Sequence, residues 1–146
     1  MSAPKLAYPA TRYDPSPLVD LTTRAERERL SAGALRAFFN IAARWQLRDE
    51  DARLLLGGVS HGPYYALKKN PERVLAADTL LRISYLVGIF KALHILHSEA
   101  LADEWVRLPN TNRIFGGQTP LAYLLRGGLP AMQTVRRLLD ARRGGV

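Results

Sequence analysis

The chain has 146 residues, of which 21 are Lys or Arg, 13 are Asp or Glu and 47% are hydrophobic. This length suits one domain or a small domain with an appendage, and the hydrophobic content excludes a wholly disordered chain. Because the chain has no cysteine, a disulfide scaffold, a Cys-ligated metal site and a thiol nucleophile are excluded. The net charge of +8 favours an anionic partner, but it is spread along the chain, so a plain solvated basic surface explains it equally well.

The first part of the chain, residues 1–21, is predicted to be an extended arm. Four of the nine prolines lie within the first 17 residues, and each proline moves its predecessor out of the helical region. We find no apolar run of signal-peptide length at the N-terminus, and the most apolar stretch, residues 80–101, is interrupted by charged residues and histidines. We therefore expect a soluble, cytoplasmic protein that does not contact a membrane.

Helical signals begin after this arm. Thr23 and Glu26 have the spacing of a capping box, in which a hydroxyl and a carboxylate each accept from the other residue's backbone N–H. Ser31 is predicted to restart a helix, because apolar residues recur every three or four positions from there to Trp45.

Two short helices are predicted next. The acidic residues 49–51 favour a helix N-terminus, where negative charge is stabilised, and Gly57-Gly58 ends that helix. Ser60 is expected to cap the following helix, which Asn70-Pro71 ends.

The second half is also predicted to be helical. A single long helix is expected over residues 76–107, with apolar residues on more than one side, so it should be a central helix buried on several faces. After a loop, Thr119-Pro120 provides a cap and a first-turn proline, Gly127-Gly128 closes that helix, and Pro130 opens the last one. We find no sustained alternation of period two, so the predicted fold is all-α.

The sequence does not support catalysis. His94 and His97 share a helix face, but no carboxylate three or four positions away completes a metal site. The favoured interpretation is that both histidines lie at the solvent-exposed edge of a buried helix. The side chains of adjacent acidic residues in 49–51 and 103–104 point about 100° apart on a helix. This favours a role in helix capping and solvation over general acid–base catalysis. Residues 115–120 lack the lysine of a phosphate loop and follow no strand. We predict no enzyme, no metal and no cofactor.

The segment from Asp49 to Lys69 has the dimensions and polarity of a helix-turn-helix unit. In such a unit the start of the second helix meets base edges and the lysines meet phosphates. The same three-helix arrangement is also common as pure structure, and Gly62-Pro63 in the first turn is unusual for a reading helix. The predicted DNA-contacting residues are Ser60, His61, Tyr64, Tyr65, Lys68 and Lys69.

Four motifs in the second half follow one another in a distinctive order. They are Trp105 with Pro109-Asn110, Phe115-Gly116-Gly117 with Thr119-Pro120-Leu121, Gly127-Gly128-Leu129, and Val135-Arg136-Arg137-Leu138-Leu139-Asp140. In this order they resemble the Xre/MbcA/ParS-type antitoxins, which are partners of RES-domain toxins, and the resemblance covers about residues 76–146. Residues 31–69 resemble the Xre-like N-terminal domain of the same family.

The resemblance implies an antitoxin that binds a RES-domain toxin, an NAD-consuming enzyme, and places its C-terminal residues over the toxin's NAD pocket. It also implies repression of the antitoxin's own operon. The expected parts are the arm (1–21), an Xre-like helix-turn-helix domain (22–75) and a toxin-binding domain (76–146). The implied toxin-binding residues are Phe115, Gly116, Gly117, Thr119, Arg136, Arg137, Arg142, Arg143, Gly144, Gly145 and Val146.

Four further interpretations accompany this one. The motif residues Trp105, Pro109, Gly116, Gly117, Pro120 and Gly127 are more typical of residues that shape a domain than of residues that touch a toxin. The free carboxylate of Val146 is the local group that could imitate an anionic ligand. The long apolar helix predicts a homodimer, and the competing function is a stand-alone repressor whose C-terminal domain only dimerises.

Overall fold

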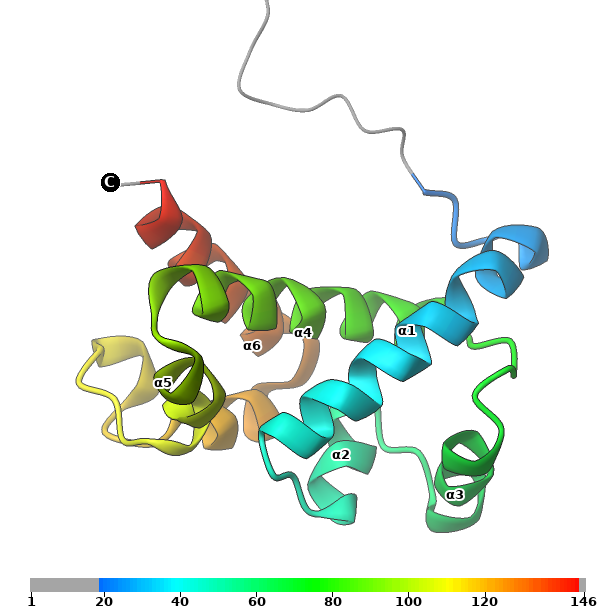
Figure 1. The fold of residues 1–146 in the computed structure, drawn as a ribbon, viewed down its shortest axis with the longest axis horizontal. Helices are drawn as coiled ribbons and strands as arrows, with labels where there is room; N and C mark the ends of the chain where they lie inside the picture. The colour runs from blue at the N-terminus through cyan, green and yellow to red at the C-terminus, as the bar shows by residue number, and fades with distance from the viewer. Residues whose placement is uncertain (1–18, 145–146) are drawn as a thin grey trace, which may run out of the picture.

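The computed structural model describes residues 19–144, and all regular elements in that range are helices (Figure 1). The predicted arm therefore falls almost wholly outside the described residues, as do Gly145 and Val146. The all-α prediction is confirmed. The elements are α1 (Arg24–Arg44), α2 (Asp49–Leu55), α3 (His61–Lys69), α4 (Ala77–Leu96), α5 (Glu99–Glu104), the 3-10 helices η1 (Trp105–Arg107) and η2 (Arg113–Phe115), and α6 (Pro120–Arg143).

Helix α1 is continuous across Ser31. The Thr23 side chain caps its first turn by accepting a hydrogen bond from the backbone N–H of Glu26, as predicted. The prediction that Ser31 restarts a helix is wrong. Ser31 is buried inside α1, and its hydroxyl accepts a hydrogen bond from the backbone N–H of Leu75 at 2.9 Å. This hydroxyl thus joins α1 to the segment that leads into α4.

Helices α2 and α3 follow the predicted boundaries. The acidic residues 49–51 occupy the first turn of α2, and Gly57 and Gly58 form the turn after it. Helix α3 ends at Lys69 with Asn70 as its C-cap residue, as expected. Ser60 stands at the N-cap position of α3, but its side chain makes no capping hydrogen bond, so that detail of the prediction is wrong.

The predicted single helix over residues 76–107 is wrong. Helix α4 ends at Leu96, His97 is extended, and the Ser98 side chain caps α5 by accepting from the N–H of Leu101. The interruption lets Trp105 turn back into the core, where it is buried. An unbroken helix would instead carry this residue farther along the α4 axis by about 1.5 Å per residue.

Helix α4 is the central helix of the fold, and it packs against α1 and α6 (Figure 1). Its buried residues lie on several faces, as predicted. Among the described helices, α4 alone is long and apolar enough to cross a membrane by length and composition, with a mean hydropathy of 1.5 over 18 residues. Its packing between two other helices is that of the core helix of a globular protein.

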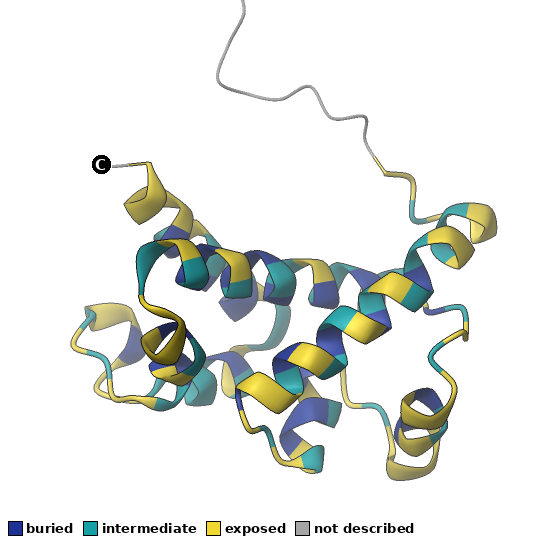
Figure 2. Ribbon diagram, viewed as in Figure 1, coloured by how far each residue is buried: buried dark blue, intermediate teal, exposed yellow. Residues whose placement is uncertain are grey.

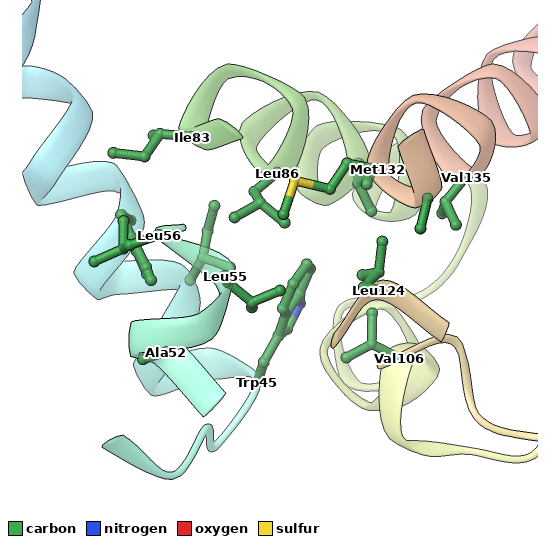
Figure 3. Close-up of a cluster of buried hydrophobic side chains, with 14 of the residues drawn as sticks. Trp45, Ala52, Leu55, Leu56, Ile83, Leu86, Val106, Leu124, Met132 and Val135 are labelled. Atoms are coloured by element: carbon green, nitrogen blue, oxygen red, sulfur yellow. The ribbon is translucent and has the colours of Figure 1, made fainter. Parts of the chain in front are cut away.

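One hydrophobic core contains residues from both predicted domains. Trp45, at the end of α1, is fully buried, and its ring lies among buried side chains of α2, α4 and α6 (Figure 3). These are Leu55, Leu86, Leu124 and Met132. Buried residues line the inward faces of the helices, while the outer face of α1 is exposed (Figure 2). The two predicted domains, residues 22–75 and 76–146, therefore share one core. Their separate roles in binding DNA and toxin stay a prediction.

Helix α6 is kinked where the sequence predicts a boundary. The Thr119 side chain caps its first turn by accepting from the N–H of Ala122 at 3.1 Å. Gly128 has φ 61° and ψ −141°, which is not helical, and Pro130 lies just after it. The predicted stop at Gly127-Gly128 and the restart at Pro130 are confirmed.

Candidate toxin-binding and DNA-binding surfaces

The loop between η1 and α6 is anchored by Phe115. The Phe115 side chain is 3% exposed, and its ring meets the rings of Trp105 and Tyr123 edge-on, with centroids 5.9 and 5.3 Å apart. Phe115 was predicted to contact a toxin; its side chain is buried here, and its contact with a toxin stays a prediction. Its aromatic contacts hold the loop against α6.

Local hydrogen bonds give this loop its shape. The Asn112 side chain accepts from the N–H of Ile114 at 3.1 Å, and the chain then turns through Gly116 in the left-handed region, with φ 58°. Gly116 and Gly117 are exposed, whereas Thr119 is half-buried at the cap of α6. The loop therefore exposes a glycine turn to solvent, and the buried aromatic ring of Phe115 holds the loop in place.

The four arginines of α6 that were predicted to bind a toxin fall into two groups. Arg137, Arg142 and Arg143 are exposed, as is Gly144. The guanidinium of Arg136 instead lies across Gly88 of α4, in the space that a side chain at residue 88 would fill. Its Nε also donates to Asp140 at 2.9 Å.

Gly88 is thus a packing residue that the sequence pattern did not single out. The one signal in the sequence is a glycine inside an otherwise strong helix pattern, which often marks a close approach. Arg136 is consequently less available to a partner than its three neighbours on α6.

Helix α3 exposes most of the predicted DNA-contacting residues. Ser60, His61, Tyr65, Lys68 and Lys69 are exposed. Tyr64 is 1% exposed, and its ring packs against Phe39 of α1 with centroids 5.9 Å apart. Tyr64 therefore holds α3 against α1, and burial raises the pKa of its phenol.

Asp49 of α2 binds two of these exposed side chains. The Tyr65 hydroxyl donates to one carboxylate oxygen at 2.6 Å, and the Lys68 ammonium lies 3.4 Å from the other. The hydrogen bond from Tyr65 lowers the pKa of the Asp49 carboxyl, and the same bond raises the pKa of the Tyr65 phenol. A negative charge thus sits beside the lysine that is expected to meet phosphate.

His94 belongs to a charged cluster that joins three helices. Its Nε2 lies 3.1 Å from Asp103 of α5, and the other Asp103 oxygen accepts from Arg44 of α1 at 3.0 Å. Within residues 19–144 we find no group of three His, Asp or Glu side chains that could hold a metal ion. The His94 contact to Asp103 is structural, and a search along one helix face could not find it because Asp103 lies beyond the break at His97.

Two comparisons place the chain among known proteins. The family described as the antitoxin Xre/MbcA/ParS C-terminal toxin-binding domain matches residues 91–145. The chain is also 42% identical over 112 residues to the uncharacterized protein y4oB of Sinorhizobium fredii, which covers 76% of this chain and 84% of that protein. No solved structure matches.

The chain belongs to the Xre/MbcA/ParS antitoxin family. The matched toxin-binding domain of this antitoxin comprises the end of α4, α5, η1, the loop with η2 that Phe115 anchors, and α6. Helix α3 lies outside that domain, on the opposite side of the molecule from the loop (Figure 1).

Proposed function

We propose that this antitoxin neutralises a RES-domain toxin that degrades NAD, and that it does so by covering the toxin's active site without chemistry of its own. The match of residues 91–145 to the family's toxin-binding domain carries the proposal. The exposed glycine turn at Gly116 and Gly117, and the exposed arginines at the end of α6, are the surfaces of that domain expected to meet the toxin.

The test is co-expression with the RES-domain protein expected to be encoded beside the antitoxin, followed by co-purification and an assay of NAD consumption. We expect a stable complex in which NAD consumption is abolished. A free toxin that keeps consuming NAD in the presence of the antitoxin would contradict the proposal.

The C-terminal residues have a separate test. We expect deletion of residues 144–146 to leave the complex intact and to restore NAD consumption, because these residues would occupy the pocket. Full inhibition by the shortened chain would exclude the Val146 carboxylate as a ligand mimic.

The helix-turn-helix formed by α2 and α3 is proposed to bind operator DNA and to repress the antitoxin's own operon. The exposed residues His61, Tyr65, Lys68 and Lys69 support this role. Each phosphate contact steepens the dependence of affinity on salt, so tight and salt-sensitive operator binding is expected. Such binding without any toxin complex would favour the alternative, a stand-alone repressor.

We also propose a homodimer within the toxin complex, located in the cytoplasm. An apolar groove of about 610 Å³ between α1 and α4 supports the dimer, because water-exposed apolar surface favours association. Its walls include Leu30, Ala34 and Leu80. Sedimentation of the antitoxin at several concentrations tests this expectation, and a monomer throughout would contradict it.

A further inference from the structure

The toxin-binding domain contains a long stretch without acidic residues. From Trp105 to Leu139 the sequence has no Asp or Glu, and its charged side chains are all arginines. These are Arg107, Arg113, Arg126, Arg136 and Arg137. The loop and the first part of α6 therefore carry unbalanced positive charge, in a chain whose excess is otherwise diffuse.

A surface hollow of about 510 Å³ lies within this stretch, between η2 and the first half of α6. Arg113 and Arg126, which are both exposed, contribute to its walls. Its remaining lining combines the glycine turn and one amide with apolar and aromatic surface. The residues concerned are Ile114, Phe115, Gly116, Gln118, Tyr123 and Gly127.

The two guanidinium groups of this hollow are not neutralised within the described part of the chain, where every ion pair involves other residues. Arg126 donates to the Gln118 side chain at 3.1 Å, which orients its guanidinium and leaves further N–H donors unused. A guanidinium presents donors in a planar fork that matches a carboxylate with two parallel hydrogen bonds. Two such groups around one hollow suit an anion.

We propose that the hollow between Arg113 and Arg126 binds an acidic side chain, Asp or Glu, of the toxin. The inference rests on the proposed function and names the chemistry of the partner surface. A protein carboxylate fits better than a DNA phosphate because the hollow lies in the toxin-binding domain, across the molecule from α3 (Figure 1). Ile114, 37% exposed, adds apolar surface at the hollow, as in protein–protein interfaces with buried apolar centres.

The experiment compares charge reversals in the full-length antitoxin. The double variant Arg113→Glu/Arg126→Glu is titrated into purified RES-domain toxin by calorimetry at low and moderate salt. We expect at least about a tenfold loss of affinity at low salt, because like charges across an interface repel. The loss should shrink as salt is raised.

A matched control carries the same kind of charge change elsewhere. Arg36 of α1 is exposed and takes no part in the ion pairs of the described residues, so Arg36→Glu should bind toxin as the wild type does. Thermal melting of each variant checks that the fold is retained. The neutral double variant Arg113→Gln/Arg126→Gln should lie between the wild type and the reversal.

A toxin carrying Lys in place of one surface Asp or Glu should regain affinity for the double reversal variant of the antitoxin. A scan of such toxin variants identifies the acidic residue that the hollow binds.

An unchanged affinity of Arg113→Glu/Arg126→Glu, or an equal loss with Arg36→Glu, would overturn the inference while the proposed function stands. Loss of operator binding with toxin binding intact would assign the hollow to DNA and also overturn it. Failure of the wild type to bind toxin would instead contradict the proposed function.

Discussion

Ser31 is a buried polar residue whose role depends on a partner far away in the chain. It is 1% exposed, and its hydroxyl accepts from the N–H of Leu75, which is 44 positions later. The same hydroxyl donates to the carbonyl of Arg27 within α1. Because a buried N–H without a partner is costly, this hydroxyl stabilises the path of the chain into α4.

The first prediction concerns that hydrogen bond. We expect Ser31→Ala to lower the free energy of unfolding by about 1–3 kcal/mol, since the buried N–H of Leu75 is left without its acceptor. Urea denaturation measures the change. The control is Ser84→Ala on the exposed side of α4, which should change the free energy by less than about 0.5 kcal/mol. Equal effects of the two substitutions would contradict the assignment.

The second prediction contrasts two glycines. Gly128 has φ 61° and ψ −141°, so Gly128→Ala should destabilise the protein by about 1–3 kcal/mol through backbone strain. Gly33 lies within α1 with open space where a side chain would stand, so Gly33→Ala should stabilise it by up to about 1 kcal/mol. Thermal melting should show opposite shifts. A shift of the same sign in both variants would show that the kink at Gly128 is not built as described.

At the scale of the elements, the acidic residue Asp49 of α2 contacts the basic helix α3. Asp49 accepts from Tyr65 and lies beside Lys68, whereas Lys69 is exposed at the end of α3. The carboxylate holds both side chains in place, but it also weakens the positive potential that a phosphate would meet. The pair α2–α3 therefore carries lysines that would attract a phosphate and a carboxylate that partly offsets their positive charge.

The third prediction follows from that arrangement. If α3 meets DNA, Asp49→Asn should raise DNA affinity about two- to tenfold at low salt, because a negative charge beside the phosphates is removed. Glu50→Gln removes the same charge from the same turn, but Glu50 pairs with Arg48 at 2.7 Å, so it should have a smaller effect. Fluorescence anisotropy with operator DNA measures both. Equal affinities of the wild type and the Asp49 variant would contradict the role of α3.

The Asp49–Tyr65 contact has its own pH signature. Because the contact raises the pKa of the Tyr65 phenol, Asp49→Asn should lower that pKa toward its ordinary value. Spectrophotometric titration, with Tyr65→Phe as the reference that removes the signal, measures the shift. The hydrogen bond itself is expected to persist at mildly acidic pH, since the pKa of the Asp49 carboxyl is lowered, and to be lost only as the pH falls through that lowered pKa.

At the scale of the whole molecule, the described residues form one hydrophobic core. Trp45 at the end of α1 is fully buried beside Met132 and Leu124 of α6 (Figure 3). Arg44 of α1 also pairs with Asp103 of α5. A shared core means that neither part can lose its partner without exposing apolar side chains.

The fourth prediction is that the chain unfolds in one cooperative transition, with coincident changes in secondary structure and in the Trp signal. A fragment of residues 76–146 should fail to fold cooperatively, because Trp45 and the leucines of α2 no longer cover α6. Circular dichroism of the full chain and the fragment measures this. Two separate transitions, or a folded fragment, would show that the predicted domains are independent.

Local patterns in the sequence determined the helices and most of their ends. The caps at Thr23 and Thr119 and the breaks at Gly57-Gly58 and Gly127-Gly128 depend on groups only a few residues apart, so spacing alone predicts them. The ordered motifs of the second half likewise indicate the antitoxin family, because their order and spacing are properties of the sequence itself. The helix-turn-helix spacing placed α2 and α3 correctly, and their contact with DNA stays a prediction.

The tertiary structure decided which of the predicted site residues are exposed and which are buried. Phe115 and Tyr64 were expected at binding surfaces, but the side chains of both are buried. Phe115 packs against Trp105 and Tyr123 on either side of its loop, and Tyr64 packs against Phe39 of α1. The break at His97 also depends on packing. The apolar spacing continues past His97, but a straight helix would carry Trp105 away from the core in which it is buried. Spacing along one helix shows which side chains share a face. Only the packing of distant segments determines what covers that face.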